Sequence, residues 1–221
     1  MKTLLFFLNA DDINEITGHH HGSIKYHPDK LLLYEFVMDK IREQLGFKHS
    51  EPVLLRYYPS GKKYFQCQSY MIHFNISYSE GCCVFVLSIW GNVGVDIEVI
   101  RSKSSGFYQH VMEMTFSDEE QNLVQSDSDG SFFWECWTAK EALVKYSGAG
   151  LMYDLKTIIH TAHGVYWPEM NYRLSLIKMR LGAAVISLVA DPACELDILG
   201  YSGLPVSEIQ TSMLPVLCSG R

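Results

Sequence analysis

The sequence reads Gly94-Val95-Asp96-Ile97-Glu98 near the middle of the chain, a pattern typical of a strand. Alternate residues of a strand face the same side, so Asp96 and Glu98 point together while Val95 and Ile97 face the core. Two neighbouring carboxylates repel each other unless water or a cation screens them. Oxygen ligands at this density suit a hard ion such as Mg²⁺. A solvated strand face is the alternative, and these five residues alone favour it.

Apolar periodicity on both sides of this stretch predicts alternating strands and helices. Strands are predicted over Thr3–Asn9, Val53–Tyr57, Ile72–Ser77, Cys82–Ser88, Val93–Val99, Leu155–Thr161, Tyr172–Lys178, Ala184–Ala190 and Leu196–Leu199. Helices are predicted over Asp29–Leu45, Gly106–Met114, Ser117–Gln125 and Phe132–Ser147. A chain of 221 residues forms one large domain or two small ones. We expect an α/β (α+β) fold whose halves, residues 1–92 and 93–221, pack closely together.

Composition excludes several classes of function. The formal net charge of −7 provides no general basic field for nucleic acid. The longest apolar runs have about half of the ~20 residues that cross a bilayer. The first ten residues resemble a signal peptide only faintly, because Asp11 and Asp12 stand where cleavage would be expected. The six cysteines include no Cys-x-x-Cys pair, which indicates reduced thiols and a cytoplasmic protein.

Charge is unevenly distributed along the chain. Residues 1–70 contain nine Lys and Arg against eight Asp and Glu, whereas residues 71–147 contain four against eleven. This division suits an anionic ligand held by the first part of the chain and a cation held by the second.

A second carboxylate-bearing motif runs from Trp137 to Lys145. On a helix, Trp137, Glu141 and Lys145 are spaced i, i+4, i+8 and share one face, and Gly148 would end that helix. Glu141 could join the two strand carboxylates as a third acidic group. The structural alternative is a capping box formed by Thr138 and Glu141, with an ordinary Glu141–Lys145 pair beside it.

Two further segments offer groups to a ligand. In His73–Gly81, strand alternation places Asn75, Ser77 and Ser79 on one face. The turn Ser60-Gly61-Lys62-Lys63 could hold a phosphate, although it lacks the spacing of a nucleotide P-loop. A plain surface turn is the alternative for that segment.

Taken together, these segments resemble the 4′-phosphopantetheinyl transferases of the Sfp type. The resemblance rests on four blocks in the family's order and spacing, which are Phe74-Asn75-Ile76-Ser77-Tyr78-Ser79, Gly94–Glu98, Phe116-Ser117-Asp118-Glu119 and Trp137–Leu151. The chain length resembles that of the two-half version of the family, which acts as a monomer.

The resemblance implies a fold of two similar α/β halves and an enzyme active site between them. It implies transfer of the phosphopantetheine arm of coenzyme A (CoA) to a serine of an acyl or peptidyl carrier protein, with release of 3′,5′-ADP. It also implies that Asp96, Glu98 and Glu141 bind Mg²⁺, with Mn²⁺ as the alternative. Glu141 would be the base for the carrier serine and Lys145 would contact the phosphates, so Asp96, Glu141 and Lys145 are the predicted catalytic residues.

The phosphoadenosine end of CoA would be held by basic and polar residues of the first half. The residues assigned to it by the resemblance are Lys25, Lys30, Lys62, Lys63, Ser77 and Tyr78, together with Lys145. Two of them depart from the family pattern. Tyr78 stands in place of the usual histidine, and a phenol brings no positive charge to the 3′-phosphate of CoA. Lys63 replaces a common proline and could supply that charge.

Two other functions remain open at this point. One is a different Mg²⁺-dependent phosphotransferase or phosphohydrolase, and the other is a catalytically silent protein that binds CoA or a carrier. The pathway that the carrier serves, whether fatty acid, polyketide, nonribosomal peptide or siderophore synthesis, is also open.

Overall fold

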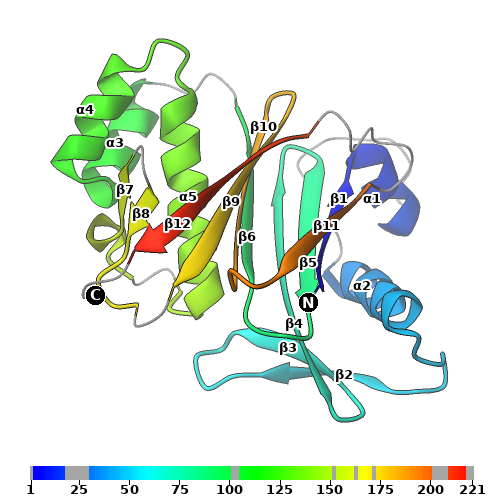
Figure 1. Cartoon of the computed structure of the whole chain (residues 1–221). Coiled ribbons are helices and arrows are strands. Elements are labelled where there is room, and N and C mark those ends of the chain that lie inside the picture. The colour runs from blue at the N-terminus through cyan, green and yellow to red at the C-terminus, as the bar shows by residue number, and fades with distance from the viewer. Residues whose placement is uncertain are drawn as a thin grey trace.

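Two six-stranded sheets lie face to face in the middle of the molecule, and helices cover the outer face of each (Figure 1). The computed structural model describes residues 2–17, 30–100, 105–150, 153–161, 164–170, 173–200 and 209–217. The predicted mixed α+β class is confirmed. No helix in these ranges is long and apolar enough to span a membrane.

The first sheet has the strand order β11-β1-β5-β4-β3-β2. Its strands are β1 (Lys2–Leu8), β2 (Val53–Tyr57), β3 (Lys63–Cys67), β4 (Tyr70–Ser79), β5 (Cys82–Ser88) and β11 (Glu195–Gly200). The helices α1 (Ala10–Thr17) and α2 (Lys30–Leu45) cover its outer face, where Leu33, Val37 and Ile41 of α2 are buried. β11 pairs in parallel with β1, so a strand from the C-terminal part of the chain completes this sheet. The division of the chain at residue 92 stays a prediction.

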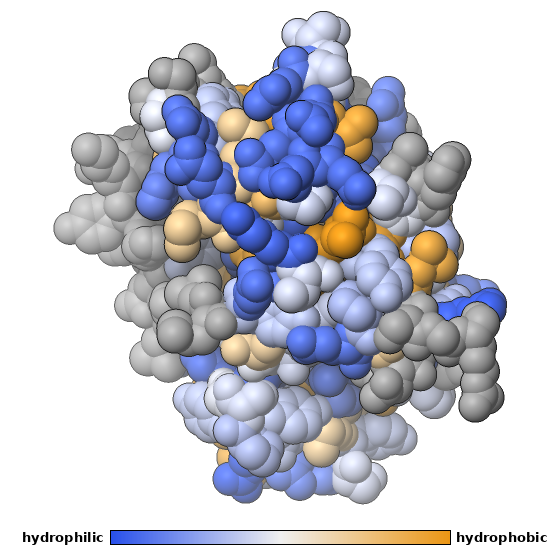
Figure 2. All heavy atoms as spheres, turned by 90° about the vertical axis from the view of Figure 1, so that its left-hand side faces the viewer, coloured by the Kyte–Doolittle hydropathy of each residue, from blue (hydrophilic) through white to orange (hydrophobic). Residues whose placement is uncertain are grey.

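The second sheet has the order β6-β10-β9-β12-β8-β7. Its strands are β6 (Gly94–Val99), β7 (Ile159–Thr161), β8 (Gly164–Tyr166), β9 (Leu174–Leu181), β10 (Ala184–Ala190) and β12 (Gln210–Leu217). On its outer side lie α3 (Ser105–Thr115), α4 (Asp118–Ser126) and α5 (Ser131–Ser147). The side of the molecule that carries α3 and α4 is largely hydrophilic, with separate hydrophobic residues between the polar ones (Figure 2).

The two sheets share one core, which is formed by every second side chain along their strands. Leu5 of β1 and Val84 of β5 meet Val95, Ile97 and Ile186 from the second sheet in one buried cluster. Val95 and Ile97 therefore face the core as predicted, which leaves Asp96 and Glu98 on the opposite side of β6. Five cysteines of the described residues, Cys67, Cys82, Cys83, Cys136 and Cys194, are free thiols.

One predicted element was wrong and four were missed. Residues 155–161 do not form a single strand, because a short 3₁₀ helix, η1 (Leu155–Thr157), precedes β7. The Asp154 side chain caps η1 by accepting a hydrogen bond from the Lys156 amide. The missed elements are α1, β3, β8 and β12.

His160 of β7 is buried, and neither ring nitrogen has a hydrogen-bond partner among the described residues. Burial, with help from the Lys178 and Lys140 charges, lowers its pKa to about 3. The unfolded chain therefore binds this proton near pH 6.5 and the folded protein only near pH 3, so stability falls as the pH falls through that window. The full shift corresponds to a loss of about 5 kcal/mol.

We expect His160→Leu to remove most of this acid sensitivity. The measurement is the free energy of unfolding by urea at several pH values between 7 and 4. The exposed His110, changed in His110→Leu, is the matched control and should keep the wild-type slope. An unchanged pH slope in His160→Leu would contradict the assignment.

Candidate active site

β4 and β6 run side by side at the junction of the two sheets, and polar side chains of β4 connect them. The Ser77 hydroxyl donates to Asp96 Oδ1 (2.7 Å), and the Ser79 hydroxyl donates to Glu98 Oε2 (2.7 Å). Asn75 Oδ1 accepts a hydrogen bond from the Val95 amide (2.9 Å). The sequence interpretation offered these β4 groups to a ligand, but in the structure each of them bonds β6.

Asp96 is the most buried carboxylate of this junction, with 4% of its surface exposed. Lys145 Nζ donates to its Oδ1 (2.6 Å) and also lies 3.1 Å from the Ser77 oxygen. Oδ2 is buried and has no hydrogen-bond partner among the described residues. Burial raises the pKa of Asp96, and the Lys145 charge and the Ser77 hydrogen bond oppose that rise.

Glu141 belongs to the same electrostatic cluster. Its pKa is raised first by burial and then by the negative charges of Asp96 and Glu98, whereas Lys145 acts in the opposite direction. β6 and α5 lie about forty residues apart in the sequence. Together they bring three carboxylates and one ammonium group close enough to interact electrostatically with one another. We call Asp96, Glu98, Glu141 and Lys145 the acidic cluster.

A glycine allows α5 to approach β6 closely enough to form this cluster. A Cβ atom at Gly94 would lie 2.1 Å from the Ala142 carbonyl oxygen and 2.5 Å from the Tyr146 nitrogen. Only glycine fits this contact, which brings the Lys145 side chain within reach of Asp96. The sequence interpretation did not assign Gly94 this role, although a glycine that opens a carboxylate-bearing strand is a signal for close backbone approach.

The capping-box alternative for the Trp137–Lys145 motif is wrong. Helix α5 begins at Ser131, so Thr138 and Glu141 lie inside the helix and form no N-terminal capping box. The Thr138 hydroxyl instead lies 2.8 Å from that of Ser187 on β10. Lys145 extends to Asp96 on another element.

The residues predicted to contact the phosphoadenosine end of CoA do not lie together in the structure. Lys25 lies outside the described residues, and Lys30 is the first residue of α2, with its side chain outside them as well. Lys63 Nζ donates to the Tyr34 hydroxyl of α2 (2.7 Å). Tyr78 packs against the core between the first sheet and α2, on the opposite face of β4 from Ser77.

Lys62 was assigned to phosphate, but its ammonium group has two partners in the protein. It donates to the Val93 carbonyl (2.9 Å) and to the Tyr146 carbonyl (2.6 Å), and it lies 5.4 Å from the centre of the Tyr146 ring. Burial lowers the pKa of Lys62 to about 7.

The fit of a divalent cation can be judged from the donor set. Within the described ranges, no three His, Cys, Asp or Glu side chains are gathered closely enough to form a metal site. The donor types of the acidic cluster nevertheless suit a hard cation, because Asp96 has a buried oxygen without a partner among the described residues, and the charges of Asp96 and Glu98 raise the pKa of Glu141. Asp96, Glu98 and Glu141 would be the ligands.

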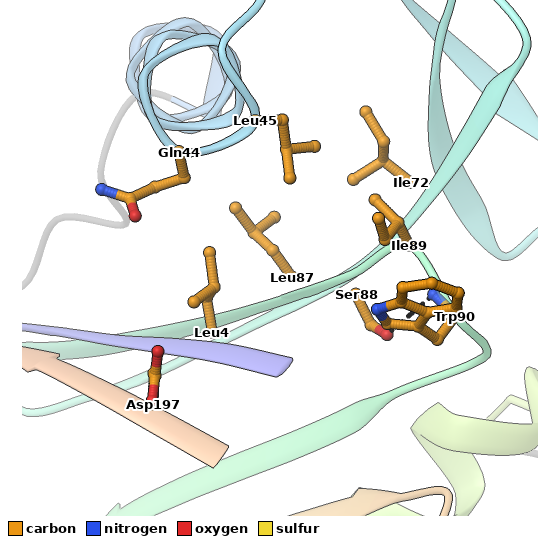
Figure 3. A pocket seen from close by; sticks show the side chains of 9 residues that line it. All are labelled: Leu4, Gln44, Leu45, Ile72, Leu87, Ser88, Ile89, Trp90 and Asp197. Carbon is orange, nitrogen blue, oxygen red and sulfur yellow. Dashed lines mark hydrogen bonds between the residues drawn. The ribbon is translucent and has the colours of Figure 1, made fainter. Parts of the chain in front are cut away.

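An apolar cavity of about 450 Å³ lies apart from the acidic cluster. It opens between the C-terminal end of α2 and the outer face of the first sheet, where Leu4, Leu45 and Leu87 point into it (Figure 3). Trp90 and Asp197 line its edge. None of the acidic cluster residues contributes to its wall.

One comparison with known proteins covers the part of the chain that contains the acidic cluster. Residues 92–189 match the family model of the 4′-phosphopantetheinyl transferase superfamily. The chain is 36% identical over 93 residues to the 4′-phosphopantetheinyl transferase AcpT of Escherichia coli K12, covering 41% of this chain and 46% of that protein. It is 30% identical over 149 residues to the 4′-phosphopantetheinyl transferase gsp of Aneurinibacillus migulanus, covering 66% and 56%.

The chain spans about half the length of these curated relatives. Among solved structures, the holo-[acyl-carrier-protein] synthase of Thermotoga maritima has 17% identity and a TM-score of 0.36, covering 44% of this chain and 61% of that one.

Fold and site define a mixed α+β protein with a partly buried acid–base cluster where its two sheets meet. The family-model match supports the 4′-phosphopantetheinyl transferase superfamily for residues 92–189, which carry this cluster, and the similar sequences are themselves named as 4′-phosphopantetheinyl transferases.

Proposed function

We propose that this protein is a 4′-phosphopantetheinyl transferase of the Sfp type. It would move the phosphopantetheine arm of CoA to a serine of an acyl or peptidyl carrier protein and release 3′,5′-ADP. The observation that carries the proposal is the contact between Asp96 of β6 and Lys145 of α5, with electrostatic coupling of Glu141 to Asp96, Glu98 and Lys145. The similar sequences with transferase names support it. We also propose that the protein is a cytoplasmic monomer.

The reaction exchanges one phosphorus–oxygen bond for another. The carrier serine oxygen attacks the phosphorus that bears the pantetheine arm, and the diphosphate bond to 3′,5′-ADP breaks. A bound Mg²⁺ or Mn²⁺ would neutralise charge on the diphosphate oxygens. Asp96, Glu98 and Glu141 would hold that ion.

The chain's own residues have distinct roles in this proposal. Glu141 is the candidate base for the serine proton, because its raised pKa moves its proton affinity toward neutral pH. Lys145 would contact the phosphates from its position beside Asp96, and Ser77 orients both groups. Lys25, Lys30, Lys63 and Tyr78 stay proposed contacts of the phosphoadenosine end.

The proposal is tested by incubating the protein with CoA, Mg²⁺ and a panel of apo carrier proteins. A carrier that gains the mass of one phosphopantetheine arm supports the transferase. If the protein binds CoA but modifies no carrier, the silent homologue is favoured. If it cleaves phosphate esters without a carrier, the other phosphotransferase or phosphohydrolase is favoured.

A further inference from the structure

Lys62 joins two parts of the chain that the acidic cluster depends on. Its two acceptors are the Val93 carbonyl, next to the first residue of β6, and the Tyr146 carbonyl, in the last turn of α5. Asp96 follows Val93 by three residues, and Lys145 directly precedes Tyr146. A single ammonium group therefore bonds the backbone near both members of the Asp96–Lys145 pair.

The turn that carries Lys62 also packs on the end of α5. At Gly148, with φ of +75°, a Cβ atom would lie 2.8 Å from the Ser60 oxygen and 3.0 Å from Lys62 Cβ. The turn itself is closed by hydrogen bonds between Tyr58 and Lys62 (2.8 Å) and between Gly61 and Tyr58 (2.9 Å). The hydrogen-bonded turn therefore packs closely against the C-terminal end of α5, with no room for a side chain at Gly148.

The chemistry of these contacts favours a structural partner for Lys62 over an anionic ligand. The last carbonyls of a helix lack intrahelical partners and attract cations, so the Tyr146 carbonyl is a suitable acceptor. The Tyr146 ring adds a cation–π contact. The lowered pKa of Lys62 agrees with an ammonium group withdrawn from water.

We propose that Lys62 is a positioning residue, which fastens the Tyr58–Lys62 turn to β6 and to the end of α5 and so fixes Lys145 and Glu141 relative to Asp96. This inference rests on the proposed function for its catalytic consequence. It replaces the expected contact between Lys62 and CoA phosphate with a contact inside the protein.

Lys62→Met tests the proposal because it keeps an unbranched side chain only one atom shorter and removes the donor. We expect kcat for carrier modification to fall about tenfold to a hundredfold through misplacement of Lys145 and Glu141. The dissociation constant for CoA should stay within about twofold of wild type, and Lys62→Arg should restore part of kcat. Lys156→Met, at an exposed lysine, is the matched control for the loss of charge.

Gly148→Ala perturbs the same contact from the helix side and should also lower kcat. Gly130→Ala is its control, because Gly130 is the N-cap of the same helix, has φ of +71° and has no atom within 4 Å of an added Cβ. Both variants carry the strain of a left-handed alanine, so only displacement of the turn distinguishes them. Equal kcat in the two variants would contradict the proposal.

A loss of CoA affinity in Lys62→Met with unchanged kcat would overturn the positioning role and make Lys62 a phosphate contact. Amide exchange at Gly148, whose N–H donates to the Val144 carbonyl (2.9 Å), gives a readout independent of activity. Faster exchange in Lys62→Met supports the fastening, and unchanged exchange refutes it. If the wild type modifies no carrier and binds no CoA, the proposed function fails, while the exchange result still decides whether Lys62 holds α5.

Discussion

Asp96→Asn is expected to lower the rate of phosphopantetheine transfer by about a thousandfold, the order of magnitude seen when a key electrostatic group is removed from an active site. The asparagine keeps the shape of Asp96 and can still accept the Ser77 hydrogen bond. It removes the negative charge that holds Lys145 and that would bind a divalent cation. The measurement is a single-turnover rate with saturating CoA, followed by the mass of the carrier.

The control for this variant is Asp118→Asn, which changes an exposed carboxylate on α4. Its transfer rate should match that of wild type. The Asp96→Asn protein should remain folded, because asparagine keeps the side-chain volume and can still accept the Ser77 hydrogen bond, and thermal unfolding checks this. A folded Asp96→Asn protein with a rate within tenfold of wild type would exclude the acidic cluster as the catalytic centre.

Lys140→Met is expected to cost about 3–5 kcal/mol of stability, the usual result of breaking one side of a buried ion pair. Lys140 and Glu120 are fully buried, and Lys140 Nζ lies 2.6 Å from Glu120 Oε2. Nζ also donates to the carbonyls of Thr115 (2.8 Å) and Leu155 (3.0 Å). The substitution leaves a buried carboxylate without its counter-charge and two carbonyls without a donor.

Urea denaturation measures this loss, and the double variant Lys140→Met/Glu120→Gln tests its origin. Neutralising Glu120 removes the uncompensated charge, so the double variant should be more stable than Lys140→Met alone. If the stability loss of the double variant equals the sum of the losses of Lys140→Met and Glu120→Gln, the uncompensated Glu120 charge is not the cause of the loss. Lys156→Met, at an exposed position, should change stability by less than about 0.5 kcal/mol.

Most of the fold was predictable because its elements have clear apolar periodicity. Val53–Tyr57, Cys82–Ser88 and Ala184–Ala190 match β2, β5 and β10 residue for residue, and α5 differs from its prediction by one residue at its start. β12 was missed, and its Pro215 lies inside a strand that pairs on both sides, a position where proline usually argues against a strand. Local patterns cannot reveal such a pairing.

The candidate site was predictable in its residue types but not in its contacts. Strand alternation correctly placed Asp96 and Glu98 on one side of β6. The assignment of Lys62 to a phosphate could not foresee its two carbonyl partners, because Val93 and Tyr146 are 31 and 84 residues away. Helix spacing likewise suggested that Lys145 pairs with Glu141, whereas the close approach at Gly94 brings it to Asp96.

The sequence by itself determined most helices and strands and the side to which their side chains point, since these depend on short-range periodicity. It also supplied the acidic and basic groups. Only the tertiary structure decided which groups meet. Pairing of Asp96 with Lys145 and of Lys62 with the end of α5 requires two sheets and a helix to pack at one junction. That packing is set by the summed burial of side chains from the whole chain, which no single segment encodes.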